Sequence, residues 1–431
     1  MQKQTPLKKW LMLISLGFMG GTFYMSAYVG ATYYTQLVEG LNMTNTQYGL
    51  ASTIVSPIGA ILIIPGAFLG DKFDAKKTLV FSIGAQSILN LSWPLWVHSF
   101  ITYVLWRATF ALLTCAYWGA LIKYINNLDG EDSAGSSFTT YYLINGLSGA
   151  VGSFIPLWVV NAMDAGVGMI VFVEGIITSV ATILVFFFLE DEKQLAKRGI
   201  YLKGDDPIQI KHIFYLIKYP GFWMMFLAYG LGVSFYNYIA YLTPYLTNVF
   251  EMDPSLSSAL AIIRQYGVNL VAPIGGFICD RVLKATYKWY IVGYTILAAM
   301  FAGMTIFFNS NSNVIVVGIY TTILACMVMM VYTTLWSVLR ELHIPTMVTA
   351  TLSGIATISE RAIQMVLPVI FGRFMDTMEP TQAFNSIFLV MAVIGVLAVL
   401  NGVWIARHHK KCLAGLRSFA AMTGMKEAVE E

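Results

Sequence analysis

Apolar stretches of one recurring length constrain this chain more than any other feature. Runs of about 20 mostly apolar residues, the length of a transmembrane helix, recur from Trp10 to Arg407 with short polar breaks between them. Hydrophobic residues make up 57% of the 431 positions and charged residues only 11%, against roughly 25% charged residues in soluble domains. A water-soluble core cannot account for this pattern, so the sequence predicts an all-α membrane protein that crosses the bilayer repeatedly.

The apolar runs predict twelve transmembrane helices. We expect them at 10–34, 47–70, 77–97, 100–124, 135–160, 166–189, 220–248, 256–279, 287–308, 313–339, 346–372 and 382–406. The first run is too long for a secretory signal and further spans follow it, so we expect it to be retained. An even number of spans places both termini on one side of the membrane.

Basic residues gather in loops on one side of this topology: Lys3, Lys8, Lys9, Lys72, Lys76, Lys77, Arg281, Lys284 and Lys288. Short loops rich in Lys and Arg stay in the cytoplasm, so we expect cytoplasmic termini. The longest connection, 190–219, is also rich in lysine and lies at the middle of the chain. We therefore predict a six-helix bundle over 1–189, a cytoplasmic linker over 190–219, a second six-helix bundle over 220–406 and a cytoplasmic tail over 407–431.

The two halves of the chain resemble each other in sequence, which indicates an internal duplication. The matched pairs in the first and seventh expected helices are Gly20 with Gly232, Phe23 with Phe235, Tyr24 with Tyr236 and, after one residue of slippage, Tyr28 with Tyr241. The ends of the second and eighth helices also align, Ala67–Lys72 with Gly276–Arg281. The alternative is that two apolar helices share chance identities, and the Asp-basic pair in both equivalent loops argues against it.

The segment Ala67–Lys77 resembles the loop motif between helices 2 and 3 of the major facilitator superfamily. Its matching residues are Leu69, Asp71, Lys72, Lys76 and Lys77, whereas Ala67 and Asp74 stand where the motif has glycines. The resemblance extends over the whole chain in span number, linker position and repeat. It implies two six-helix bundles related by an axis along the membrane normal, with a substrate near the midplane and alternating access to it.

The same resemblance implies a conformational latch. In that family the motif aspartate contacts neighbouring helix ends in one conformation, because a carboxylate is stabilised near helix amino termini. This role falls on Asp71 with Lys72 and, in the second half, on Asp280 with Arg281. The alternative is that these are solvated loop charges.

Ionisable residues within the expected spans are candidates for substrate contact, because each costs about 2.5–3.5 kcal/mol to insert. Arg264 and Arg361 are predicted to bind an anion and Arg107 to supplement them, since a guanidinium forms a planar fork that fits carboxylates, phosphates and sulfonates. Basic residues in helices 8 and 11 also resemble the oxalate/formate antiporter branch, which implies a dicarboxylate. Arg107 and Glu360 depart from that branch, so a larger or sugar-derived acid also fits. Structural ion pairs with Glu360 are the alternative.

Glu360 is the candidate for proton coupling, because burial and a nearby arginine can shift a carboxyl group between its charged and neutral forms. A static ion pair is the alternative. Glu174 falls on a peripheral helix, where we expect a polar packing contact. None of the histidines falls within an expected span, so the sequence predicts no imidazole relay.

Aromatic residues recur on the helices that the resemblance places around the substrate. The candidates for substrate contact are Tyr24, Tyr28, Tyr236, Tyr241 and Trp336. Their polar groups can hydrogen-bond an oxygen-rich solute. The alternative is that they fill space or belong to the interfacial aromatic belt. The glycines at 146, 149 and 152 have the spacing that lets membrane helices pack closely.

The polar segments contain no nucleotide-binding loop, nucleophile motif or metal-ligand spacing, and the net charge of +3 does not indicate a nucleic-acid partner. We therefore expect a monomer in the lipid bilayer, without cofactor, metal or enzymatic activity. The predicted function is secondary transport of a small organic anion, a carboxylate or sugar acid, across the cytoplasmic membrane by alternating access, with proton symport or anion exchange. The alternatives are proton-coupled efflux of drugs or amphiphiles and a membrane sensor that does not transport.

Overall fold

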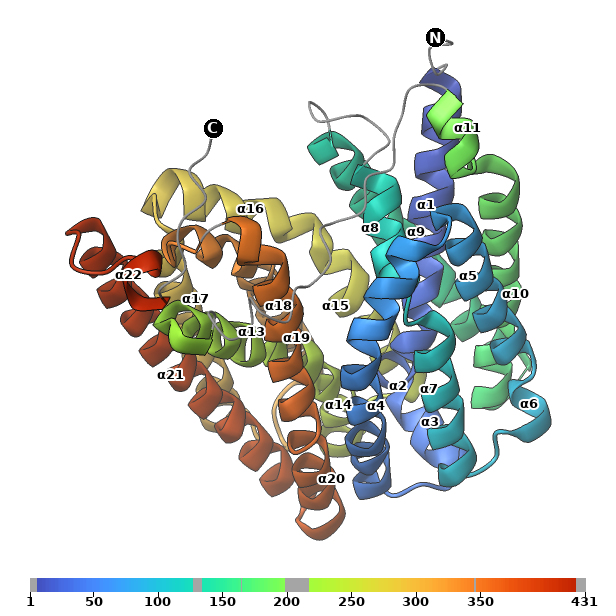
Figure 1. Ribbon diagram of the computed structural model, residues 1–431. Coiled ribbons are helices and arrows are strands. Elements are labelled where there is room, and N and C mark those ends of the chain that lie inside the picture. The colour runs from blue at the N-terminus through green and yellow to red at the C-terminus, as the bar shows by residue number, and fades with distance from the viewer. Residues whose placement is uncertain (1–5, 127–133, 164, 198–216, 345, 424–431) are drawn as a thin grey trace. The chain divides into compact units, whose positions relative to one another are not determined.

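The computed structural model describes the chain except for residues 1–5, 127–133, 164, 198–216, 345 and 424–431. Its described residues form helices and connecting turns with no strand (Figure 1). Contacts divide the chain into two units: Met1–Asp205 with Met252–Asn269, and Asp206–Glu251 with Leu270–Glu431. The segment Met252–Asn269 thus packs with the first unit, although it follows helices of the second unit in the sequence.

The first unit contains long helices joined by short turns. Its elements are α1 (Pro6–Ala27), α2 (Val29–Thr32), α3 (Tyr34–Gly40), α4 (Asn45–Lys72), α5 (Ala75–Leu91), α6 (Trp93–Trp96), α7 (Phe100–Thr114), α8 (Tyr117–Asn126), α9 (Ala134–Met163), α10 (Val167–Phe188), α11 (Glu192–Lys197) and α15 (Pro254–Tyr266).

Local sequence signals start several of these helices. The Thr44 side chain accepts a hydrogen bond from the Gln47 amide (3.1 Å), and the Gln47 side chain accepts one from the Thr44 amide (3.0 Å). Such reciprocal capping satisfies amide groups that have no partner within the helix. Ser99 and Thr102 form the same arrangement at the start of α7.

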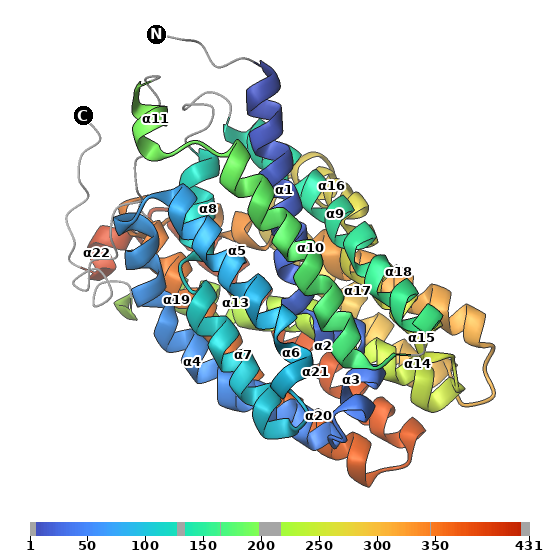
Figure 2. The ribbon, with the colours of Figure 1, turned by 90° about the vertical axis from the view of Figure 1, so that its right-hand side faces the viewer.

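Close packing holds the first unit together. Helix α1 packs against α9 and α10, and α10 packs against α5; Figure 2 shows these helices side by side. A Cβ atom at Gly152 would come within 2.7 Å of the Met25 sulfur, and one at Gly149 would collide with the Tyr266 ring. The close helix approach predicted from the glycine spacing is therefore confirmed.

The second unit is also helical, with more interruptions. Its elements are α13 (Pro220–Tyr238), η1 (Ile239–Tyr241), α14 (Leu242–Phe250), α16 (Ala272–Phe277), η3 (Ile278–Leu283), α17 (Thr286–Phe307), α18 (Val314–Tyr332), η4 (Leu335–Glu341), α19 (Thr346–Gln364), α20 (Leu367–Thr377), α21 (Pro380–Leu413) and α22 (Phe419–Thr423). A further short helix, η2 (Gly267–Val271), crosses the division between the units. Helix α17 packs along α21, and α13 packs along α19.

Ten helices of the described residues are long and apolar enough to cross a bilayer. The two expected spans that are missing from this set are 77–97 and 220–248. The first corresponds to α5, which has 17 residues, and α6; the second corresponds to α13, η1 and α14. Both segments are helical, but the count of twelve spans and the cytoplasmic termini remain predictions.

Candidate functional site

The second unit contains a polar group of side chains where α13 and α19 meet. The Glu360 carboxylate accepts hydrogen bonds at Oε1 from Asn237 Nδ2 (2.9 Å) and Gln364 Nε2 (2.8 Å). Gly230 permits this approach, because a Cβ atom there would lie 2.8 Å from the Ser359 hydroxyl. Close contact between the two helices thus brings Asn237 to Glu360.

Arg361 follows Glu360 but does not pair with it. Its NH1 donates to Gln364 Oε1 (3.2 Å), and its buried Nε has no hydrogen-bond partner among the described residues. Successive residues of a helix point about 100° apart, so the two charges diverge and the Gln364 amide bridges them. Within the described part of the chain Arg361 forms no ion pair. Its guanidinium therefore retains hydrogen-bonding capacity for a ligand.

One aromatic side chain interacts with this pair of charges, and a second packs against it. Tyr229 interacts electrostatically with Glu360 and Arg361, and its ring centroid lies 4.8 Å from that of Trp336. Trp336 is 38% exposed. Trp336 thus remains available to a ligand, and Tyr229 is a residue that the sequence analysis missed.

Two predicted tyrosines of the second unit differ in their surroundings. Tyr236 is partly exposed and stacks on Tyr332, with centroids 4.5 Å apart. Tyr241 is buried; its hydroxyl donates to the Pro368 carbonyl (3.5 Å) and its ring meets that of Phe371 at 5.1 Å. Tyr241 therefore packs inside the unit in this conformation, whereas Tyr236 can contact a solute.

In the first unit Arg107 has neutral neighbours. Its NH1 donates to the Ser52 hydroxyl (2.9 Å), and its guanidinium carbon lies 5.8 Å from the centroid of the Tyr103 ring. It forms no ion pair with any residue that the structure describes. Arg107 is partly exposed, so it can also contact an anion.

Arg264 is placed differently. It is 2% exposed on α15, which packs against α9 and α2 of the first unit. Arg361 belongs to the second unit, so the predicted pair of arginines does not share one unit. An anion would reach Arg264 only after a rearrangement that exposes it.

The predicted tyrosines of α1 lie in an aromatic cluster of the first unit. Tyr24 and Tyr28 stack with centroids 5.7 Å apart, and Tyr24 meets the edge of Trp118 at 6.5 Å. Both tyrosines are partly exposed. Their spacing of one helical turn therefore places two rings on one face, as the sequence predicts.

The residues predicted to form a latch are mostly exposed. The side chain of Asp71 lies outside the described residues. Lys72 is exposed and lies over the rings of Phe68 (5.5 Å) and Phe73 (6.0 Å). Asp280 and Arg281 are exposed in η3. Among the described residues, neither Asp280 nor Arg281 forms a hydrogen bond or ion pair with a neighbouring helix end.

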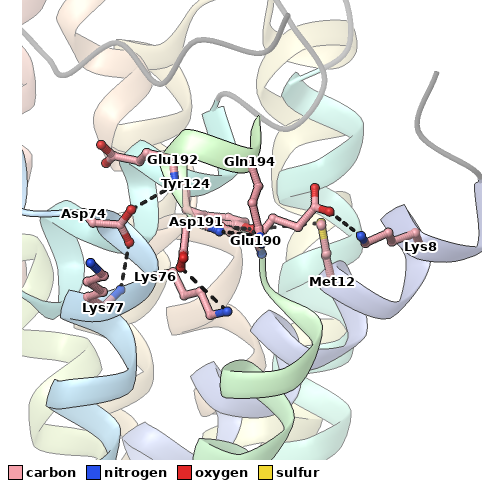
Figure 3. Close-up of polar contacts among 10 residues, drawn as sticks. All are labelled: Lys8, Met12, Asp74, Lys76, Lys77, Tyr124, Glu190, Asp191, Glu192 and Gln194. Atoms are coloured by element: carbon pink, nitrogen blue, oxygen red, sulfur yellow. Dashed lines mark hydrogen bonds and ion pairs between the residues drawn. The ribbon is translucent and has the colours of Figure 1, made fainter. Parts of the chain in front are cut away.

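Asp74, which replaces a motif glycine, accepts hydrogen bonds at two helix starts (Figure 3). Its two carboxylate oxygens accept from the Lys77 amide (3.1 Å) and the Glu192 amide (2.9 Å). Glu192 Oε1 in turn accepts from the Ala75 amide (3.1 Å) and from Lys123 Nζ (2.8 Å). Each carboxylate therefore stabilises the other's helix start, and α5 is tied to α11.

Neighbouring contacts extend this network. Lys8 pairs with Glu190, and Lys76 lies 3.7 Å from the Asp191 carboxylate. The Glu190 amide donates to the Tyr124 hydroxyl (2.9 Å), which donates to the Glu190 carbonyl (3.2 Å). The ends of α1, α5, α8 and α10 are thus joined.

A comparable helix start lies in the second unit. The buried Glu341 carboxylate accepts from the amides of Thr286 (2.6 Å) and Tyr287 (2.7 Å), the first residues of α17. Nearby, His343 Nε2 lies 3.0 Å from His409 Nδ1. Burial and the neighbouring His409 lower the pKa of His343. Among the described residues no three His, Cys, Asp or Glu side chains converge as metal ligands.

Comparison with known proteins shows the family to which the chain belongs. The model of the Major Facilitator Superfamily matches residues 12–368. The chain is 23% identical to inner membrane protein YihN of Escherichia coli (strain K12) over 300 residues, covering 68% of this chain and 70% of that protein. It is 22% identical to inner membrane protein YqcE of the same organism over 405 residues, covering 91% and 94%.

Solved structures show the same fold at low sequence identity. A bacterial homolog of the human lysosomal transporter Spinster has a TM-score of 0.73 at 12% identity, covering 94% of this chain and 98% of its own. The nucleoside transporter NupG has a TM-score of 0.70 at 14% identity, covering 93% and 99%. The D-xylose-proton symporter has a TM-score of 0.68 at 14% identity, covering 92% and 96%.

Proposed function

The chain belongs to the major facilitator superfamily, and we propose that the solute it carries is a small organic anion bound at Arg361. It is a secondary transporter and a multi-pass protein of the cytoplasmic membrane. The solute and the coupling mode are the parts that we propose.

The incomplete pairing of Arg361 carries this proposal. A guanidinium removed from water costs free energy unless hydrogen bonds and an opposite charge compensate it. Arg361 donates to one neutral amide and leaves a buried Nε without a partner among the described residues. A carboxylate can supply both the missing charge and a two-point hydrogen bond.

The surroundings of Arg361 favour a carboxylate with a polar body, such as a sugar acid. Tyr229 interacts with the charged pair, and Trp336 packs against Tyr229. Aromatic rings with a polar group can pack on a solute and hydrogen-bond its oxygens. Asn237 and Gln364 offer further amide groups. A purely lipophilic cation could pack on the aromatic rings, but it would not accept hydrogen bonds from the amide groups, and Arg361 would repel it.

We propose proton symport through Glu360. Its carboxylate is one amide away from Arg361, because Gln364 donates to Glu360 and accepts from Arg361. An anion at Arg361 would be repelled by an ionised Glu360, so proton binding and anion binding each favour the other. Exchange of one anion for another remains the alternative to symport.

The substrate class is tested by thermal unfolding of the purified protein with carboxylates, sugar acids, sulfonates and phosphate esters, since a ligand that binds the folded state stabilises it. We expect a carboxylate to raise the midpoint and Arg361→Gln to weaken its binding by roughly tenfold or more. Arg373→Gln is the matched control, because Arg373 is exposed on α20 of the same unit. If lipophilic cations alone raise the midpoint, the solute is not an anion.

A further inference from the structure

A carboxylate in the first unit is buried without a counter-charge. Glu174 on α10 is 0% exposed, and neither of its oxygens has a hydrogen-bond partner of normal geometry among the described residues. The polar groups that interact with it are the Ser26 hydroxyl and the Tyr33 phenol, and no basic side chain does so in the described part of the chain. The polar packing contact expected from the sequence does not compensate this charge. A carboxylate in apolar surroundings must either bind a cation or take up a proton and become neutral.

Two amides of α5 lie beside the same serine. Gln86 Nε2 donates to the Phe23 carbonyl (3.1 Å) and to Ser26 Oγ (3.1 Å), and Asn90 Nδ2 donates to Ser26 Oγ (2.5 Å). The oxygens of both amides are buried without a partner among the described residues. In each amide group the nitrogen donates to Ser26 and the oxygen is attached to the same carbon. Both amide oxygens therefore lie close to Ser26.

Close helix packing brings Glu174 to these amides. Helix α10 packs along α5 and α1, as Figure 2 also shows. A Cβ atom at Gly175 would lie 2.8 Å from the Leu91 amide and 3.1 Å from the Asn90 side chain. The glycine next to Glu174 therefore lets α10 approach α5 at the level of Asn90.

The cluster has more acceptors than donors. Four buried oxygens of this cluster have no donor of normal geometry among the described residues: two from Glu174, one from Gln86 and one from Asn90. A proton on Glu174 would add one donor and satisfy one amide oxygen at most. A hard cation binds several oxygens at once. A monovalent ion would neutralise the single negative charge, whereas a divalent ion would leave an excess positive charge in the interior.

We propose that Glu174, Gln86 and Asn90 bind a sodium ion between α1, α5 and α10. Ser26 is a positioning residue, since its oxygen accepts both amide N–H groups and turns the amide oxygens away from itself. All four residues belong to the first unit, so the site is complete within that unit. The proposal does not depend on the anion at Arg361, and it adds a second ligand to the transporter.

The test uses the purified full-length protein without organic solute, in sodium, potassium or choline chloride at equal ionic strength. We expect sodium to raise the unfolding midpoint saturably by several degrees, and equilibrium dialysis with radioactive sodium to find a single ion per chain. Glu174→Gln should lose both responses and melt above the unchanged protein in choline chloride, because it removes an uncompensated buried charge. Glu39→Gln, the same change at an exposed position of α3 in the first unit, should keep both responses.

A second variant retains the charge and removes one ligand. Asn90→Leu should raise the sodium concentration for the half-maximal response roughly tenfold. Equal midpoints in the three salts would overturn the proposal. So would an undiminished sodium response in Glu174→Gln, an unchanged half-maximal concentration in Asn90→Leu, or a midpoint that responds to pH and not to sodium.

Discussion

At the scale of single residues, one amide separates two opposite charges in the second unit. Gln364 donates to Glu360 and accepts from Arg361. A direct ion pair between the two charged groups would satisfy both and leave little interaction for a solute. With an amide between them, each charge keeps capacity for another partner, which is the basis of the proposed anion and proton binding.

The Gln364 bridge gives a prediction. Gln364→Glu places a carboxylate where Arg361 now meets an amide oxygen at 3.2 Å, so the new side chain should pair with Arg361 and compete with the anion. We expect binding of the anion to weaken by roughly tenfold or more, measured by titration of the unfolding midpoint. Gln382→Glu introduces the same charge at an exposed position of α21 and should leave binding unchanged. If the Gln364→Glu variant binds the anion as tightly as the unchanged protein, Arg361 does not bind the anion.

Charged candidates were predictable from the sequence, whereas their neutral partners were not. Glu360 and Arg361 are conspicuous because few charges fall within apolar runs. Gln364 lies one turn from both and could have been found by helical spacing. Asn237 and Tyr229 could not, because their proximity to Glu360 depends on how α13 packs on α19.

At the scale of helices, Asp74 and Glu192 connect the starts of α5 and α11. We expect Asp74→Ala to lower the free energy of unfolding by about 1–3 kcal/mol, because it removes an acceptor from two helix starts at once. The measurement is the unfolding midpoint of the purified protein in detergent. Asp74→Asn keeps a capping oxygen and should recover much of the loss.

A double-mutant cycle separates mutual capping from two independent effects. Combining Asp74→Ala with Glu192→Ala should destabilise the protein by less than the sum of the single changes, since each variant already disrupts the same connection. Strict additivity would show that the two carboxylates act separately. Lys193→Ala, an exposed change on α11, provides the baseline.

Helix positions were predicted well where one apolar run forms one helix. The expected spans 166–189 and 287–308 are nearly α10 and α17. The prediction missed interruptions such as the break between α1 and α2 at Tyr28 and the 3-10 turn η1 after α13, because the apolar run continues through them. The break between α19 and α20 had a visible signal, since Pro368 lies in the first turn of α20.

The Asp74 contacts were not predicted, and the latch role of Asp71 stays a prediction because its side chain lies outside the described residues. The family motif assigns the latch role to Asp71, and Asp74 stands where that motif has a glycine. The sequence around Asp74 does carry a helix-start signal, an aspartate followed by Ala75 and the first turn of α5. Its second partner, the Glu192 amide, is distant in sequence, and only the folded unit brings it close.

At the scale of the whole molecule, the two halves that the sequence repeat predicts to be related have different polar contacts. The start of α5 is stabilised by Glu192 from α11, whereas the start of α17 is stabilised by Glu341 from η4. The sequence repeat predicted equivalent helices from shared glycines and aromatics. It could not predict which carboxylate meets which helix start, since these residues lie outside the repeated segments.

The orientation of the chain yields a prediction about its surfaces. Glu39 and Lys284 are both exposed, and the positive-inside pattern assigns them to opposite sides of the membrane. In intact cells, an impermeant maleimide should label Glu39→Cys and should label Lys284→Cys only after the cells are opened. The unchanged protein, with four cysteines, gives the background. Labelling of Lys284→Cys in intact cells would show that the assigned orientation is wrong.

The last prediction concerns the transport cycle in proteoliposomes. If Glu360 carries the coupling proton, a pH gradient that is alkaline inside should drive net uptake of the anion without ATP, and a protonophore should abolish it. Glu360→Gln should lose net uptake driven by the gradient and keep exchange of internal for external anion, because exchange needs no change in the protonation of Glu360. Loss of both activities alike would assign Glu360 to anion binding or to structure, and net uptake insensitive to the pH gradient would favour anion exchange as the coupling mode.

Glu174→Gln is the informative companion variant. A role for Glu174 in sodium binding predicts that its effect on uptake follows the sodium concentration, whereas the effect of Glu360→Gln follows the pH gradient.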